Sequence, residues 1–136
     1  MNDFDPEEWL AVAELCCNSG QAEAHLRTAI NRAYYAALLS TKQRIEQAMG
    51  SGTVPHAGTH SAILRAVDSG GRKFKRILGA LRHLKRVREV ADYELEAEPP
   101  ERHWVRSQVK LSRDVIRNHI KKLPDTDYRM LRVPSA

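Results

Sequence analysis

One long run of helical spacing, residues 21–49, dominates the sequence. Apolar or small side chains recur in it every three or four positions: Leu26, Ile30, Ala33, Tyr34, Ala37, Leu38, Thr41 and Ile45. This spacing matches the turn of an α-helix and not the two-residue period of a strand. A helix of this length extends about 40 Å and needs neighbours along most of it to bury its apolar face. The run therefore favours a bundle of helices.

Shorter helical runs lie on either side of it. Further helices are predicted from Asp5–Pro6 to about residue 17, at 60–67, at 72–95 and at 101–123, with breaks at 18–20, 50–58, 68–71, 98–100 and Pro124. The breaks contain the glycine, proline, serine and asparagine that end helices, and no segment has convincing strand spacing. We therefore expect an all-α, antiparallel bundle of four to five helices. It should form a single domain over residues 1–123, followed by a loosely ordered tail at 124–136.

Several sequence features favour a soluble, cytoplasmic protein that does not enter a membrane. No stretch approaches the roughly 18 apolar residues of a membrane span, and the acidic start, Met1–Asp5, is unlike a signal peptide. The only two cysteines are the neighbours Cys16 and Cys17. Adjacent side chains on a helix point about 100° apart and rarely pair, so we expect reduced cysteines in or near the core.

The charge balance indicates an anionic partner. The net charge is +5, and it comes mostly from arginine, with 15 Arg and 7 Lys. The planar guanidinium suits bidentate contacts to phosphate better than the lysine ammonium does. Nucleic acid is therefore the first candidate partner, and an acidic protein is an alternative.

The helix predicted at 72–95 has an apolar face that becomes polar toward its end. At 100° per residue, one stripe contains Phe74, Ile77, Leu78, Leu81, Leu84, Ala91 and Leu95. Lys85, Arg88 and Asp92 lie on this same stripe. A charge on a buried face needs a partner, and Arg88 and Asp92 are four residues apart, so they can pair. Two interpretations stay open: an ion pair that joins helices, or a polar pocket or dimer seam in which Arg88 meets a phosphate.

Other polar side chains of the two long helices allow two interpretations each. Tyr34 lies on the apolar stripe and is predicted to be in the core. Asn31 and Tyr35 point the same way, and they either face the Arg88 pocket or bond to each other. The helix around residues 72–86 is basic and forms either a solvated face or a surface for RNA; its cations are Arg72, Lys73, Lys75, Arg76, Arg82, Lys85 and Arg86.

Three motifs, in this order and spacing, resemble the HEPN domain family. Ala29–Ala37 (AINRAYYAA) resembles the long second helix of these proteins. The loop with Gly58–Ser61 (GTHS) resembles their THSG segment. Arg88–Tyr93 (REVADY) resembles the RxxADY segment of one prokaryotic branch. Together the motifs span about residues 6 to 123.

The resemblance implies an antiparallel bundle that forms a homodimer, with a composite site at the dimer seam. Many HEPN proteins are metal-independent ribonucleases of toxin–antitoxin or antiviral defence systems, and others are non-catalytic partners of nucleotidyltransferase-like proteins. The ribonucleases carry an arginine, then four to six residues, then a histidine, whereas this chain has Tyr93 in the place of the histidine. Tyrosine is a poor base at neutral pH. The candidate catalytic residues are therefore Arg88, Asp92 and Tyr93, and the candidate RNA-binding residues are Asn31, Arg32, Tyr35, His60, Lys85 and Arg86.

Other histidines fit the expected chemistry less well. The spacings of Arg76 with His83 and of Arg113 with His119 match the nuclease pattern, but chance alone gives about two such matches. Arg76 and His83 are predicted on the solvated face, and His119 near the inward face of the last helix. His56 and His60 have a zinc-like spacing, but they lie at a glycine-containing loop without a third ligand. We expect no metal and no cofactor.

Three hypotheses follow. The first is a weakly catalytic or non-catalytic HEPN module that binds RNA or a nucleotide. The second is a metal-independent endoribonuclease toxin that uses Arg88 and its neighbours. The third is an interaction module for an acidic protein.

Overall fold

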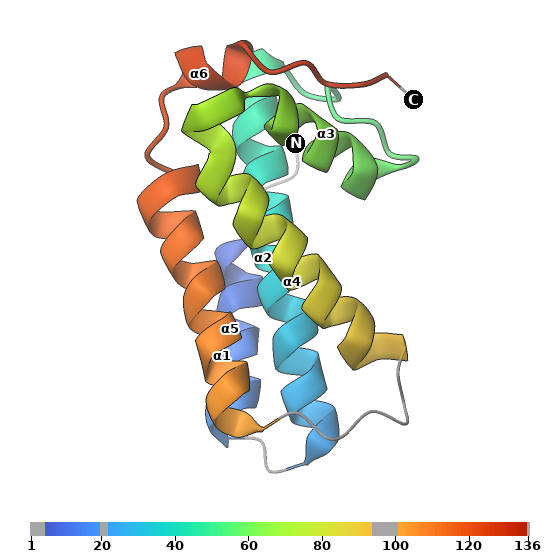
Figure 1. Ribbon diagram of the computed structural model, residues 1–136, viewed down its shortest axis with the longest axis vertical. Helices are drawn as coiled ribbons and strands as arrows, with labels where there is room; N and C mark the ends of the chain where they lie inside the picture. The colour runs from blue at the N-terminus through green and yellow to red at the C-terminus, as the bar shows by residue number, and fades with distance from the viewer. Residues whose placement is uncertain (1–4, 20–21, 94–100, 136) are drawn as a thin grey trace.

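The longest helix, α2 (Glu23–Met49), runs through the middle of the protein (Figure 1). This computed structural model describes residues 5–19, 22–93 and 101–135, and no strand occurs within those ranges. The other elements are α1 (Glu7–Ser19), α3 (Thr59–Ser69), the 3-10 turn η1 (Gly71–Phe74), α4 (Lys75–Tyr93), α5 (Arg102–Val115), the π-helical turn η2 (Ile116–Ile120) and α6 (Asp125–Arg129). α1 and α4 run in one direction, and α2 and α5 in the other (Figure 1). The expected all-α, antiparallel helical bundle is confirmed at this level.

α2 is buried on several sides because α1, α4, α5 and α6 all pack against it. Its buried residues are Leu26, Ala29, Ile30, Ala33, Tyr34, Ala36, Ala37, Leu38, Ser40, Thr41 and Ile45. The alanines are small, so neighbouring helices can approach closely. Deep in the contact with α5, the Ser112 hydroxyl donates a hydrogen bond of 2.7 Å to the Ala33 carbonyl. The periodic run of the sequence is therefore the central helix of the core.

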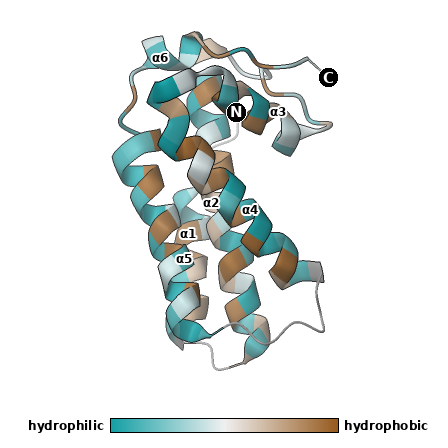
Figure 2. Cartoon of the chain, viewed as in Figure 1, coloured by the Kyte–Doolittle hydropathy of each residue, from teal (hydrophilic) through white to brown (hydrophobic). Residues whose placement is uncertain are grey.

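α4 has the apolar stripe that its spacing predicted. Phe74, Ile77, Leu81, Leu84 and Ala91 are all buried, and Figure 2 shows apolar and polar residues alternating along α4. The helix begins later than expected, because residues 71–74 form a 3-10 turn before it. The predicted break at 98–100 lies outside the described residues.

The loop between α2 and α3 is held by a glutamate of α2. The Glu46 carboxylate accepts hydrogen bonds from the backbone N–H of Gly52 (2.9 Å) and of Val54 (3.3 Å). Val54 itself is buried. These contacts place the start of α3, and with it His60, against α2.

The prediction of a loose tail at 124–136 is wrong for the described residues. Pro124 ends the preceding helix but also precedes α6, and Tyr128 of α6 is fully buried. The Tyr128 hydroxyl donates a hydrogen bond of 2.6 Å to the Ile120 carbonyl, and its ring meets the Phe74 ring edge-on at 5.2 Å. Arg44 of α2 lies over the same ring, at 4.8 Å from its centroid. One aromatic anchor thus attaches a short helix to the bundle.

Two remaining observations concern cross-links and membranes. Cys16 and Cys17 are both free, and Cys17 is buried, as their adjacent positions predicted. None of the helices in the described part of the chain has the length and apolarity that crossing a bilayer requires.

Candidate functional site

Six polar and aromatic side chains from three helices meet where α4 crosses α2. We call them the Arg88 cluster: Asn31, Tyr34 and Tyr35 of α2, His60 of α3, and Arg88 and Asp92 of α4. Hydrogen bonds, an ion pair and ring contacts connect them. The structure therefore brings together residues that the sequence placed in three separate motifs.

Arg88 and Asp92 form the ion pair that their spacing predicted. The Arg88 Nη1 atom lies 3.4 Å from Asp92 Oδ2, and the side chains are 11% and 25% exposed. The same oxygen accepts a hydrogen bond of 3.0 Å from the Asn31 side-chain amide. The arginine and the aspartate are thus partly buried, and Asn31 connects them to α2.

The two tyrosines place aromatic rings under the guanidinium. The Arg88 Cζ atom lies 5.2 Å from the Tyr34 ring centroid and 5.7 Å from that of Tyr35, within the range of cation–π attraction. Tyr34 is fully buried, which confirms its predicted place in the core. Because Asn31 bonds to Asp92 across the helix interface, the hypothesis that Asn31 faces Arg88 is confirmed.

His60 of α3 contacts the same two tyrosine rings as Arg88. Its Nδ1 atom lies 3.1 Å from the Tyr34 hydroxyl, and its ring contacts both tyrosines. Burial, and after it the positive charges of Arg88 and Lys85, lower the pKa of His60. Burial also raises the pKa of Tyr34 to about 12, against the effect of Arg88. In neutral His60 the tautomer sets the direction of the hydrogen bond with Tyr34. Nδ1 either accepts from the Tyr34 hydroxyl, with the ring proton on Nε2, or donates to the Tyr34 oxygen, with the lone pair on Nε2.

The other predicted RNA-binding residues make their contacts outside the six residues of this cluster. The Arg32 guanidinium stacks over the Trp9 ring at 4.1 Å. Lys85 is 3.8 Å from Glu89, and Arg86 is exposed on α4. The Tyr93 backbone ends α4, but its side chain lies outside the described residues, so its place in the cluster stays a prediction.

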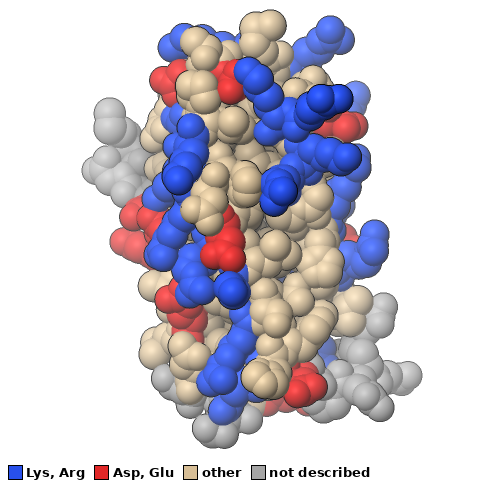
Figure 3. Space-filling model, turned by 60° about the vertical axis from the view of Figure 1, so that its left-hand side comes forward, with Lys and Arg blue, Asp and Glu red and all other residues tan. Residues whose placement is uncertain are grey.

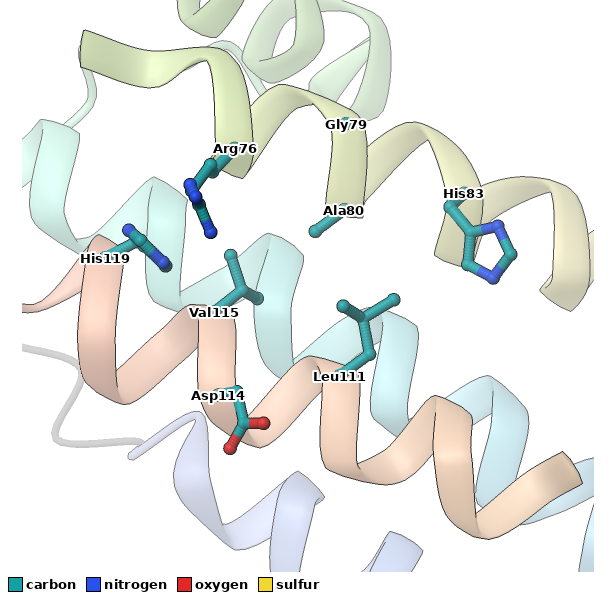
Figure 4. Close-up of a pocket in the computed structure, with 8 residues that line it drawn as sticks. All are labelled: Arg76, Gly79, Ala80, His83, Leu111, Asp114, Val115 and His119. Atoms are coloured by element: carbon teal, nitrogen blue, oxygen red, sulfur yellow. The ribbon is translucent and has the colours of Figure 1, made fainter. Parts of the chain in front are cut away.

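His119, Arg76 and His83 belong to a different feature, a groove between α4 and α5 (Figure 4). Arg76 and His83 are exposed, as predicted. Both also line the groove, so one side of each residue borders α5. The residues that line this groove do not include Arg88. His119 is thus not the missing histidine of the Arg88 cluster.

A metal site finds no support in the described ranges. No group of three or more His, Cys, Asp or Glu side chains there could hold a metal ion. His56 lies in the loop before α3, while the His60 ring points to the tyrosines of α2.

Sequence reasoning missed a basic stripe along α5 and η2. Its six members follow at intervals of three or four residues: Arg102, Arg106, Lys110, Arg113, Arg117 and Lys121. In Figure 3, which brings the α5 side forward, Lys and Arg side chains extend down much of the face. Glutamates of α1 neutralise part of the stripe, since Glu14 pairs with Arg113, and Glu7 pairs with Arg117 and Lys121. The spacing alone could have revealed the stripe, but not its pairing with α1.

Comparisons with known proteins leave the family open. No family model matches the chain, and neither curated proteins nor solved structures give a significant match.

Proposed function

We propose that this protein is a HEPN-type module that binds RNA along the outer face of α4 and has weak catalytic activity or none. The observation that carries the proposal is the charge of residues 69–88, which include no acid and eight basic residues: Arg72, Lys73, Lys75, Arg76, Arg82, Lys85, Arg86 and Arg88. Of these, Arg72, Lys75, Arg76 and Arg86 are exposed, and they take part in no ion pair among the described residues. A row of exposed cations on one helix suits contacts to successive phosphates.

The Arg88 cluster supports binding over cutting. Its guanidinium is only 11% exposed and is already paired with Asp92, so a phosphate would have to compete with a carboxylate for it. Removing one partner of a buried ion pair is costly. Arg88 and Asp92 therefore serve first to hold α4 against α2, with the basic face outward.

The resemblance to HEPN proteins extends the proposal to assembly and setting. It implies a homodimer and a place in a toxin–antitoxin or antiviral defence system. It also implies a nucleotidyltransferase-like protein as a partner. Light scattering at micromolar concentration tests the dimer, and a monomer would remove the dimer-seam site from the proposal.

Salt-dependent RNA binding tests the main proposal. Fluorescence anisotropy with a labelled structured RNA should give an affinity that falls steeply with salt. The variant Arg82→Ala/Arg86→Ala should bind less tightly and reduce the slope of log K against log salt by about 1.5. The matched control Lys42→Ala/Lys122→Ala replaces two lysines outside α4. It should change the RNA affinity and the salt slope much less. A flat salt response, or equal losses in the two variants, would count against RNA binding on α4.

One observation favours an endoribonuclease as the second candidate: His60 lies beside Arg88. In metal-independent cleavage, a base removes the proton of the 2′-hydroxyl, which attacks the phosphorus, and the departing 5′-oxygen receives a proton. Neutral His60 can act as the base when Nδ1–H donates to the Tyr34 oxygen and the Nε2 lone pair is free. The imidazolium formed in this way can give the proton to the departing 5′-oxygen, and a guanidinium can stabilise the charged phosphorane. Incubation of structured RNA with the protein and EDTA tests this. Cleavage that disappears in both Arg88→Ala and His60→Ala would support the enzyme, and no cleavage at high protein concentration would exclude it.

A further inference from the structure

A second site candidate lies outside the Arg88 cluster, in the groove between α4 and α5 (Figure 4). Arg76, Gly79 and His83 line it from α4, and Leu111, Val115 and His119 line it from α5 and η2. Its volume of about 370 Å³ lies within the range of small-molecule sites.

The two ends of the groove are polar. The Arg76 guanidinium and the His119 imidazole lie at the same end, and His83 lies at the other (Figure 4). Among the described residues, no carboxylate forms an ion pair with Arg76, and Asp114, which also borders the groove, points away from α4 (Figure 4). The Arg76 end therefore offers unneutralised donors to an anion.

The far end offers one oriented imidazole. His83 Nε2 lies 2.7 Å from the side-chain oxygen of Gln108, which is buried. An amide oxygen only accepts hydrogen bonds, so Nε2 carries the proton. The lone pair of a neutral His83 is then on Nδ1, where it can accept a hydrogen bond from a ligand.

The middle of the groove is apolar. Leu111 and Val115 point toward α4 (Figure 4). Leu111 is partly exposed and Val115 is only 3% exposed, so Leu111 supplies most of the accessible apolar surface. Ala80 of α4 points toward them (Figure 4), and Gly79 lines the groove from the neighbouring position in the interior of α4, where glycine costs about 1 kcal/mol relative to alanine. A Cβ atom at this position would meet no atom within 4 Å, so packing does not require glycine here. A larger side chain at this position of the groove lining would extend into that open space.

We propose that this groove binds a small organic anion, with its acidic head group between Arg76 and His119 and a flat, ring-sized body over Leu111 and Val115. The head group is a phosphate or a carboxylate, since both fit the planar guanidinium. This site shares Arg76 with the exposed basic residues of the RNA proposal, but Arg82 and Arg86, which the RNA-binding test replaces, do not line the groove.

Titration of ¹⁵N-labelled protein with phenyl phosphate, benzoate and inorganic phosphate tests the site. Phenyl phosphate or benzoate should shift the amide resonances of Gly79, Leu111 and Val115 in a saturable way, with a Kd of about 1 mM or tighter. The tighter of the two identifies the head group. Inorganic phosphate lacks the apolar body and should bind about tenfold more weakly.

Variants locate the binding. Gly79→Leu should fill the groove and abolish the shifts, and Arg76→Ala should weaken binding about tenfold. Arg86→Ala, an exposed position on the same helix, should leave the Kd unchanged. If Gly79→Leu does not fold, Arg76→Ala and His119→Ala carry the test, since both alter accessible side chains. No saturable shift at millimolar ligand, or the same Kd in Arg76→Ala and His119→Ala as in the original protein, overturns the proposal. The RNA affinity of Arg82→Ala/Arg86→Ala, measured in parallel, tests the RNA proposal separately, because neither residue lines the groove.

Discussion

Asn31 of α2 donates a hydrogen bond of 3.0 Å to the carboxylate of Asp92 in α4, 61 positions later in the chain. The same carboxylate oxygen faces Arg88 at 3.4 Å. One partly buried oxygen thus connects the two central helices and holds the arginine in place.

We expect loss of the Asp92 carboxylate to destabilise the fold. Asp92→Ala leaves the Asn31 amide and the mostly buried Arg88 without this acceptor, at a cost of about 2–3 kcal/mol in the free energy of unfolding. Asp92→Asn keeps an oxygen for Asn31 and should cost about 1 kcal/mol. Urea denaturation measures both. The control is Glu89→Ala, which removes a more exposed pair and should change stability by at most about 0.5 kcal/mol. Equal effects of Asp92→Ala and Glu89→Ala would show that the cluster does not hold α4.

Stability should fall in mild acid because of His60. Burial and the charges of Arg88 and Lys85 hold its pKa below the ordinary value in the folded protein, so the unfolded chain binds the proton more readily. The stability from neutral His60 is fully present above the unfolded pKa of about 6.5 and is lost as the pH falls toward the folded pKa. His60→Gln should therefore reduce the loss of stability between about pH 7.5 and about pH 5.5. His56→Gln, in the preceding loop, is the control. An unchanged pH dependence in His60→Gln would contradict the assignment.

The sequence predicted those parts of the structure that local spacing determines. α2 and α4 follow from apolar periodicity, and Arg88 and Asp92 were placed inward because they continue the stripe of α4. The approach of His60 to Arg88 was not predictable in this way. It depends on how Glu46 holds the loop before α3, which is a contact between groups outside any helical period.

The missed elements have the same physical origin. α6 has five residues and no apolar period, and its position depends on contacts of Tyr128 with Phe74 and Arg44, both distant in sequence. The basic stripe of α5 was visible in the spacing, whereas its neutralisation by Glu7 and Glu14 depends on the packing of α1. The period of a sequence identifies one face of a helix, whereas the element that packs against that face is determined by tertiary contacts.

The contacts of Tyr128 lead to a prediction for the C-terminal segment. Tyr128→Ala removes a fully buried ring and should cost about 3–5 kcal/mol in the free energy of unfolding. Tyr128→Phe leaves the Ile120 carbonyl without its donor and should cost about 1 kcal/mol. Met130→Ala, at a residue that is 78% exposed, should change little. Urea denaturation distinguishes these outcomes, and a stable Tyr128→Ala protein would mean that α6 contributes no stability.

Two glycines of the α3–α4 region should respond to alanine in opposite directions. Gly70 has ordinary helical backbone angles (φ −76°, ψ −10°), but a Cβ there would overlap Phe74 and lie 2.7 Å from Leu131 Cδ2. Gly70→Ala should therefore destabilise the protein by about 1–3 kcal/mol through overpacking. At Gly79, in contrast, the added methyl group meets nothing and the helix gains propensity, so Gly79→Ala should stabilise by up to about 1 kcal/mol. Thermal and urea unfolding of the pair check both signs. A destabilising Gly79→Ala would mean that the groove between α4 and α5 is narrower than its lining indicates, and binding of an organic anion there would lose its steric basis.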